Sequence, residues 1–158
     1  MLSDAEIAKV MLTFDEGDQR RIYDCGTGNP VFAEHGHLTG GIGHNFDARP
    51  LSDAVVELLF EEDLAIALHT CKKLFPDFDK LSQPRRLALI NMAFNLGERK
   101  LSGFRHMVRE VNDRRFPQAS EAAKDSFWFI QVKARGPRVV KMFTDDEIPP
   151  EYLPREAS

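Results

Sequence analysis

Residues 85–97 are the stretch that most restricts the architecture of this 158-residue chain. Their sequence, RRLALINMAFNLG, is apolar on almost every face of a helix. Such a helix is buried all round, so other helices must surround it. Its expected end is Gly97. Shorter helical patterns follow at about 102–113, 117–124, 126–134 and 136–142, and we expect these helices to bury it.

The N-terminus predicts a further helix over residues 3–16. Ser3 and Glu6 have the spacing of a capping box, in which each side chain accepts a hydrogen bond from the other residue's amide. Apolar side chains recur on one face of this helix: Ile7, Val10, Met11 and Phe14. Gly17 can end it.

Residues 18–50 differ from the rest, because glycines and prolines interrupt short apolar pieces. This pattern predicts a small β-sheet lobe with short strands. Ser52 can cap a long helix over 52–74 that joins this lobe to a helical lobe. The helical lobe is expected to comprise about 80–143 together with the N-terminal helix 3–16. The tail, residues 148–158, is rich in proline and acids, and we expect it to be loosely held. The predicted class is α+β, mostly α, in a single domain spanning 1–158.

Composition limits the partners and the location. A formal net charge of -4 argues against nucleic acid. No segment reaches the ~18 apolar residues of a membrane span, and the N-terminus lacks the basic region of a signal peptide. We therefore expect synthesis in the cytoplasm, with no stable membrane insertion. For Cys25 and Cys71 we expect two free thiols, and one disulfide remains the alternative.

An acid and a hydroxyl stand out in the first third of the chain. Glu16 ends the first predicted helix, where the helix dipole disfavours a negative charge. Thr39 begins a glycine-dense segment, TGGIGH, over residues 39–44. An acid that donates a proton, and a hydroxyl that holds water, suit an acid-catalysed hydrolase.

Further segments accompany these two residues: 15–17, 22–23, 39–45, 85–97, 103–104 and 126–128, with Gln131, Arg135 and Arg138. In these segments, and in their order, the chain resembles the phage-type lysozymes of glycoside hydrolase family 24, the T-even phage lysozyme group. The resemblance implies a lysozyme-like fold of two lobes. It also implies hydrolysis of the β-1,4 bond between N-acetylmuramic acid and N-acetylglucosamine in peptidoglycan.

The family pattern is Glu, eight residues, Asp, five residues, Thr. The resemblance makes Glu16 the general acid and Thr39 the hydroxyl that helps to hold the water. Cys25 occupies the place of the Asp, as in some similar members, with Asp24 beside it. A thiol, with an ordinary pKa of about 8.5, can replace a carboxylate only as the thiolate.

Only one of these two neighbours can face Glu16 if the segment is extended. We favour Cys25 for the middle position, because its register matches, and Asp24 is the alternative. A third interpretation makes Cys25 a small core residue and Asp24 a turn residue.

Thirteen residues separate Cys25 from Thr39, where the family pattern has five. They include Glu34, His35 and His37, which are residue types that bind zinc. Three such residues in one loop are a weak zinc signature, so we expect no metal and no other cofactor. An exposed hairpin extension is the favoured interpretation, and a substrate-contacting loop is the alternative.

The predicted substrate-binding residues are Asp24, His44, Asn45, Phe94 and Asn95. The family histidine at the place of His44 more often supports the site by pairing with an acid of the larger lobe. Phe94 and Asn95 match family positions that line the cleft, although Phe94 fits a core position equally well. Trp128 is expected to pack the C-terminal helices.

The leading hypothesis is an active muramidase, monomeric, that is made in the (host) bacterial cytoplasm and cuts peptidoglycan glycan strands in the periplasm. It would be a phage or prophage endolysin, or a lytic domain carried by a particle or secretion system. The missing Asp motivates two alternatives. One is a non-catalytic peptidoglycan-binding or structural module, and the other is a lytic transglycosylase, which forms an anhydro sugar without water.

Overall fold

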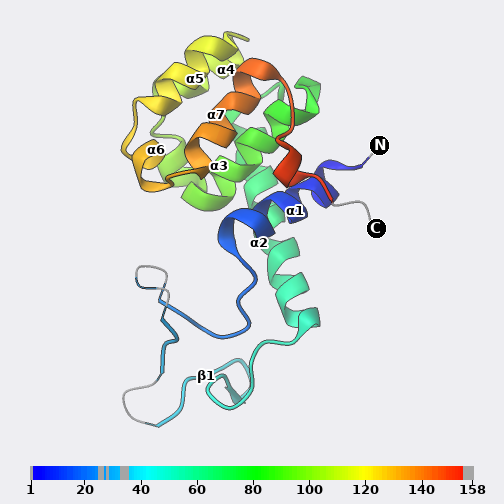
Figure 1. Cartoon of the computed structure of the whole chain (residues 1–158), viewed down its shortest axis with the longest axis vertical. Helices are drawn as coiled ribbons and strands as arrows, with labels where there is room; N and C mark the ends of the chain where they lie inside the picture. The colour runs from blue at the N-terminus through cyan, green and yellow to red at the C-terminus, as the bar shows by residue number, and fades with distance from the viewer. Residues whose placement is uncertain (1, 25–26, 28, 33–35, 155–158) are drawn as a thin grey trace. The chain divides into compact units, whose positions relative to one another are not determined.

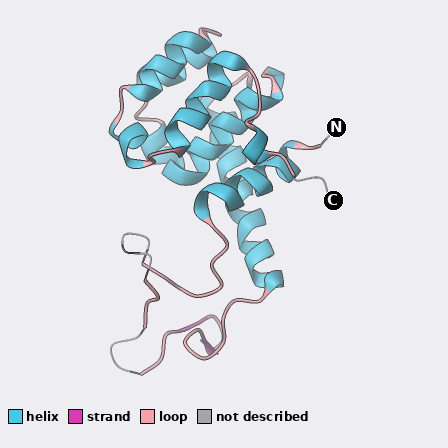
Figure 2. Ribbon diagram, viewed as in Figure 1, coloured by secondary structure: helices cyan, strands magenta, loops and turns pink. Residues whose placement is uncertain are grey.

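The computed structural model describes residues 2–24, 27, 29–32 and 36–154. The chain divides into two compact units, a small one of residues 17–61 and a helical one of residues 1–16 and 62–158. In the described part there are seven α-helices and one antiparallel sheet of two short strands (Figures 1 and 2). The predicted class, α+β and mostly α, is confirmed. The assignment of 1–158 to a single domain stays a prediction.

Helix α1 spans Asp4–Glu16 and begins at the predicted capping box. The Ser3 amide donates to the Glu6 carboxylate at 2.7 Å, and the Glu6 amide donates to Ser3 Oγ at 3.3 Å. The buried face of this helix consists of Ile7, Ala8, Met11 and Leu12. Phe14, which was expected on that face, is 50% exposed. Glu16 is the last residue of the helix, as predicted.

Helix α3, Gln83–Leu101, is the predicted central helix, and every residue from 87 to 93 is buried. Its expected end at Gly97 is only partly right. Gly97 has φ 69° and ψ 169°, which breaks the helical path, yet helical turns resume and continue to Leu101. Glycine alone adopts this backbone conformation readily, so Gly97 introduces a kink.

The four predicted shorter helices are all present, with shifted bounds: α4 Arg105–Asn112, α5 Phe116–Lys124, α6 Phe127–Gln131 and α7 Arg135–Asp145. Helix α7 packs against α3, α5 and α6, while α4 packs against α5 and α1 against α3. The apolar stretch of α3 is therefore covered by helices, as its sequence requires.

Helix α2, Asp53–Leu74, starts after Ser52, whose Oγ accepts from the Val55 amide at 3.4 Å. Its second half is buried through Leu64, Ala67, Thr70 and Cys71, and a short 3-10 helix, η1 Phe78–Lys80, follows. Cys71 is a free thiol. None of the helices in the described ranges has the length and apolarity needed to cross a membrane.

The C-terminal tail differs from its prediction. Residues Pro150–Tyr152 form a 3-10 helix, η2, that packs against α1. Tyr152 is fully buried, and its ring meets that of Phe14 edge to face at 5.9 Å. The expectation of a loosely held tail is therefore wrong for this segment, because a buried aromatic ring anchors it despite the prolines and acids around it.

The small unit contains strands β1, Thr39–Gly40, and β2, His44–Asn45, which pair antiparallel with Thr39 opposite Asn45. The turn between them holds two glycines at positive φ, Gly41 at 56° and Gly43 at 73°. The short strands expected for this region are confirmed.

Candidate active site

Glu16 lies at the end of α1 in an ion pair. Its Oε1 accepts from Arg135 Nη1 at 2.6 Å, and the amide of Asn95 lies 3.5 Å from the same oxygen. The Glu16 side chain is 36% exposed, whereas that of Arg135 is 9% exposed. Glu16 thus offers an accessible carboxyl group whose position is fixed by a buried cation.

Arg135 begins α7 and serves two acidic neighbours. Besides Glu16, it donates through Nη2 to the backbone carbonyl of Asp15 at 2.7 Å. Its Nε lies 3.6 Å from Asp15 Oδ2. The planar guanidinium has donors in a fixed fork, so one side chain can hold both contacts at once.

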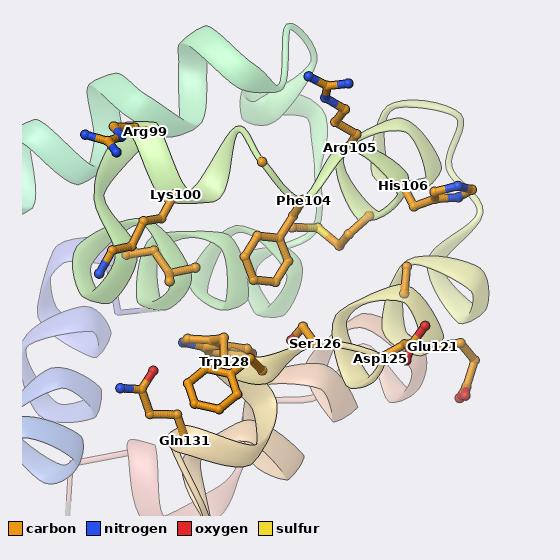
Figure 3. Close-up of a pocket in the computed structure, with 15 residues that line it drawn as sticks. Arg99, Lys100, Phe104, Arg105, His106, Glu121, Asp125, Ser126, Trp128 and Gln131 are labelled. Atoms are coloured by element: carbon orange, nitrogen blue, oxygen red, sulfur yellow. The ribbon is translucent and has the colours of Figure 1, made fainter.

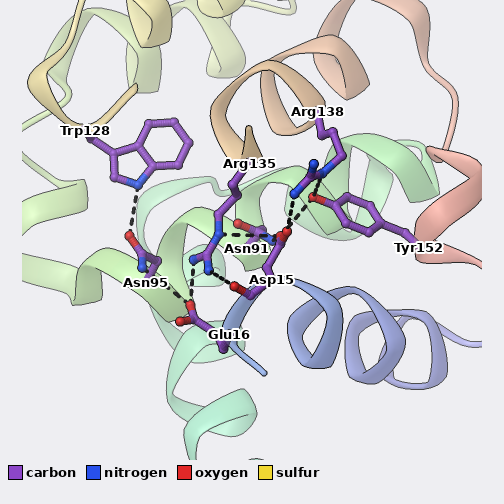
Figure 4. Close-up of polar contacts among 8 residues, drawn as sticks. All are labelled: Asp15, Glu16, Asn91, Asn95, Trp128, Arg135, Arg138 and Tyr152. Carbon is purple, nitrogen blue, oxygen red and sulfur yellow. Dashed lines mark hydrogen bonds and ion pairs between the residues drawn. The ribbon is translucent and has the colours of Figure 1, made fainter. Parts of the chain in front are cut away.

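The Asp15 carboxylate is completely buried and surrounded by donors (Figure 4). Arg138 Nη2 donates to Oδ1 at 2.7 Å. The Asn91 amide and the Tyr152 hydroxyl donate to Oδ2 at 2.8 and 2.9 Å. A buried carboxylate needs such compensation, because an unpaired charge in the interior is very costly.

Tyr152 closes this network from the tail. Its hydroxyl also accepts from Arg138 Nε at 3.0 Å. Burial, together with the charge of Asp15, raises the pKa of Tyr152, although the hydrogen bond from Arg138 opposes this. Burial works to lower the pKa of Arg138, but its bonds to Tyr152 and Asp15 outweigh that and raise it. Tyr152 therefore stays a protonated donor at neutral pH.

Asn95 links Glu16 to the aromatic interior. Its Oδ1 accepts from the Trp128 indole N–H at 3.0 Å, which fixes the orientation of the amide. Trp128 is buried and meets the ring of Phe104 edge to face at 6.3 Å. The predicted packing role of Trp128 is confirmed, and the structure adds this hydrogen bond. Phe94, beside Asn95, is half-buried.

In the small unit, Thr39 is an exposed residue of β1. Its hydroxyl donates to the carbonyl of His37 at 3.0 Å. With the proton directed to that carbonyl, the oxygen lone pairs of Thr39 can accept from the O–H of a water. This orientation suits a water-holding hydroxyl.

His44 and Asn45 make contacts within the small unit. His44 Nε2 lies 3.2 Å from the carbonyl of Arg49, and its ring contacts Phe46 edge to face at 4.8 Å. Asn45 Oδ1 accepts from the amides of Asp47 and Ala48, both at 3.0 Å. Both side chains thus have structural contacts in the turn that follows β2.

Asp24 forms a turn, because its Oδ1 accepts from the Thr27 amide at 2.9 Å. Of the remaining candidates, Cys25, Glu34 and His35 lie outside the described residues. His37 is exposed, with Nδ1 3.7 Å from Asp47 Oδ2. No group of ligands suited to a metal occurs within the ranges that the structure describes.

A pocket of about 1340 Å³ opens in the helical unit, between the end of α3 and helices α4 to α6 (Figure 3). Phe104 and Trp128 form an aromatic wall, and basic side chains from α3 and α4 line its rim: Arg99, Lys100, Arg105 and His106. Glu121 and Asp125 lie on the other side.

The rim cations differ from most others in the helical unit. Among the described residues, Arg99, Lys100 and Arg105 make no ion pair. Glu121, by contrast, is paired with Lys124 at 2.7 Å. The pocket therefore combines aromatic surface with three cationic groups available to an anionic ligand.

No role was predicted from the sequence for four residues of this network: Asp15, Arg135, Arg138 and Tyr152. Arg135 and Arg138 are three residues apart, hence on one helix face, and that spacing signals paired cations facing an acid. Asp15 adjoins the candidate acid. Tyr152 is the one aromatic residue in a polar tail, which was the available sign that the tail is anchored.

Comparison with known proteins finds relatives that cover most of the chain. A probable T4-type lysozyme of Dictyostelium discoideum is 29% identical over 157 residues, which cover 85% of this chain and 92% of that protein. A second probable T4-type lysozyme of the same organism is 25% identical over 156 residues, covering 85% and 91%.

The pre-baseplate central spike protein Gp5 of Enterobacteria phage T4 is 27% identical over 157 residues. That match covers 82% of this chain and 26% of the spike protein. The sequence model of the family described as phage lysozyme matches residues 15–140, from the acidic pair at the end of α1 to α7. The chain therefore belongs to the phage lysozyme family, and its function is lysozyme-like.

Proposed function

We propose that this protein hydrolyses the β-1,4 bond between N-acetylmuramic acid and N-acetylglucosamine in peptidoglycan. The observation that carries the proposal is the ion pair of Glu16 with Arg135, at 2.6 Å. It holds an accessible carboxyl group in a fixed position at a helix end. Glu16, when protonated, would donate to the oxygen of the departing sugar as the general acid.

Hydrolysis also needs a group that holds the water and a group that stabilises the developing positive charge. Thr39 is our candidate for holding the water, since its lone pairs are directed away from the His37 carbonyl. Cys25 remains our candidate for the middle position. Asp24 is less suited, because its carboxylate already accepts from the Thr27 amide.

The rim of the pocket supports peptidoglycan as the substrate. Stem peptides of peptidoglycan carry carboxylates, and Arg99, Lys100 and Arg105 present cations without acidic partners among the described residues. Charge-assisted hydrogen bonds to carboxylates are about twice as strong as neutral ones. We assign the stem peptide to this pocket. We also propose action in the periplasm as a monomeric endolysin.

The decisive experiment compares the wild-type protein with Glu16→Gln on Gram-negative cells whose outer membrane has been permeabilised. The wild type should clear the suspension, and the variant should lose at least about a hundredfold in rate, because the amide of Gln is not acidic enough to protonate the leaving oxygen. Glu147→Gln is the matched control, since Glu147 is an exposed acid beyond α7. A wild type that does not clear the cells refutes the hydrolase proposal.

The released muropeptides identify the reaction. Hydrolysis leaves reducing ends, whereas a lytic transglycosylase leaves anhydro sugars, and mass spectrometry separates the two. Comparing Cys25→Ser with Asp24→Asn then tests the middle position. Equal rates for both variants and the wild type would contradict its assignment to either residue.

The stem-peptide assignment has its own test. The triple variant Arg99→Gln, Lys100→Gln, Arg105→Gln should raise KM about tenfold or more at low salt, with kcat little changed. Lys72→Gln and Lys80→Gln, exposed cations already paired with acids, serve as controls. An unchanged KM in the triple variant contradicts the assignment.

A further inference from the structure

The tail of the chain reaches the residue next to the proposed acid. Tyr152 and Asp15 are 137 positions apart, and their side chains share a hydrogen bond of 2.9 Å. Tyr152 is fully buried, and its hydroxyl both donates to Asp15 and accepts from Arg138. A buried tyrosine with both bonds satisfied is a fixed part of the structure.

Asp15 places Arg135 through two of its atoms. Its carbonyl accepts from Arg135 Nη2 at 2.7 Å, and its Oδ2 lies 3.6 Å from Arg135 Nε. The first contact is a hydrogen bond and the second is an ion pair too long to be one. Arg135 Nη1 is thereby left to point at Glu16. Arg135 is shared between the carboxylates of Asp15 and Glu16. The hydrogen bonds that each carboxylate accepts from other donors determine how closely Arg135 contacts it.

Donors other than Arg135 satisfy the Asp15 carboxylate. Arg138 donates a hydrogen bond to Oδ1, while Asn91 and Tyr152 donate to Oδ2. If the Tyr152 hydroxyl were lost, Oδ2 would lose one of its two donors. The nearest further cationic group is Arg135 Nε, at 3.6 Å. A shift of Arg135 toward Oδ2 would lengthen its contact with Glu16.

We propose that Tyr152 is a positioning residue for Glu16, acting through Asp15 and Arg135. The Tyr152 hydroxyl donates a hydrogen bond to Asp15 Oδ2, so Arg135 is not drawn to that oxygen and its guanidinium stays in contact with Glu16. The charged and titratable groups of this assembly are Asp15 and Glu16 from α1, Arg135 and Arg138 from α7, and Tyr152 itself. This inference rests on the proposed role of Glu16 as the acid.

Tyr152→Phe removes only the hydroxyl and keeps the ring against Phe14. With Arg135 drawn away, Glu16 would lose the cationic donor that lies 2.6 Å from its Oε1. We expect the alkaline limb of the pH profile of kcat/KM to move up by roughly half a pH unit or more. We also expect kcat at the optimum to fall about fivefold to tenfold, because the acid is less well oriented, while KM changes less than about twofold.

Two comparisons separate positioning from loss of stability. Val111→Ala, in the buried face of α4, lowers stability at a distance from the network and should leave the pH profile in place. In an Asp15→Asn background the carboxylate that competes for Arg135 is gone, so Tyr152→Phe should add no further shift. A profile for Tyr152→Phe that has the wild-type midpoints and only a lower maximum would overturn the proposal.

A measurement without turnover keeps this test independent of the proposed function. The side-chain carboxyl of Glu16 can be followed by 13C NMR through a pH titration of the wild type and of Tyr152→Phe. A midpoint that rises in the variant supports positioning even if no hydrolysis is found. Coincident titration curves overturn the positioning proposal even if the wild type is an active hydrolase.

Discussion

The thiol of Cys71 is unreactive because of its position in the fold. The thiol is fully buried in the second half of α2, and burial raises its pKa to about 12. The thiolate is the reactive form of cysteine, so at neutral pH this side chain behaves as a small apolar residue. Cys71 is therefore not available for thiol chemistry under native conditions.

The burial of Cys71 predicts how fast its thiol reacts. In a Cys25→Ser variant, Cys71 should react with a disulfide reagent at pH 8 at least about a thousandfold more slowly than a free thiol. Addition of guanidinium chloride should restore full reactivity, because unfolding exposes the sulfur. The release of coloured thiolate measures both rates. Rapid reaction in the native protein would show that the site around Cys71 opens.

At the same scale, the sequence identified a candidate acid and a candidate hydroxyl but not the side chains that contact the acid. Glu16 and Thr39 stood out, because an acid at a helix end and a hydroxyl among glycines are local patterns. Arg135, Asp15 and Tyr152 come together only in the folded chain, across more than a hundred positions. No local pattern specifies which cation meets which acid at that separation.

Helix α3 has a buried part and a part at the rim of the pocket. Before Gly97 it is the buried centre of the helical unit, and after Gly97 it carries Arg99 and Lys100 to the rim of the pocket. The kink at Gly97, with φ 69° and ψ 169°, separates the two parts. A Cβ at this position would touch nothing within 4 Å, so only the backbone conformation requires glycine.

Gly97→Ala should therefore destabilise the protein through its backbone. The expected loss is about 1–3 kcal/mol in the free energy of unfolding, the strain of a non-glycine residue in this region. Urea denaturation measures it. Lys100→Ala, in the same helix but with helical backbone, is the control and should change the stability by less than about 0.5 kcal/mol. Equal stabilities for Gly97→Ala and the wild type would mean that the kink relaxes at no cost.

Elements were easier to predict than contacts. From residue 52 onward the helices were found because apolar residues repeat with the helical period and caps mark the starts, as at Ser52. Prolines and acids in the tail pointed to a loose segment, yet burial of the Tyr152 ring outweighed them. Continuation of α3 past Gly97 was missed for a similar reason, since packing of Leu101 in the core extends the helix.

At the scale of the whole molecule, the helical unit is joined by charge pairs between distant segments. Asp4 in α1 accepts from Arg86 Nη2 in α3 at 2.9 Å, 82 positions away. Burial alone would raise the pKa of Asp4, but the hydrogen bonds from Arg86 and Gln83 outweigh it and lower the pKa. This side chain is partly shielded, with 23% of it exposed.

A carboxyl group whose pKa is lower in the folded protein stabilises the fold at any pH above its pKa in the unfolded chain. That contribution is lost as the pH falls through the pKa of the folded state. Asp4→Asn should therefore cost about 1–2 kcal/mol at pH 6. The difference from the wild type should shrink as the pH falls below about 4, where Asp4 of the unfolded chain takes up a proton, and it should vanish below the lowered pKa of Asp4 in the folded protein. Denaturation at pH 6 and pH 3 tests this. For Glu147→Gln we expect no such difference, and a cost for Asp4→Asn that is equal at both pH values would contradict the linkage.

The contact between Tyr152 and Asp15 has a consequence for the synthesis of the protein on the ribosome. Synthesis proceeds from the N-terminus, so α1 leaves the ribosome long before the tail does. Until Tyr152 has emerged, Asp15 lacks one of its donors, and until α7 has emerged, Glu16 lacks Arg135. A nascent or truncated chain cannot assemble this network. The network around Glu16 can therefore form only after α7 and the segment that holds Tyr152 have both emerged.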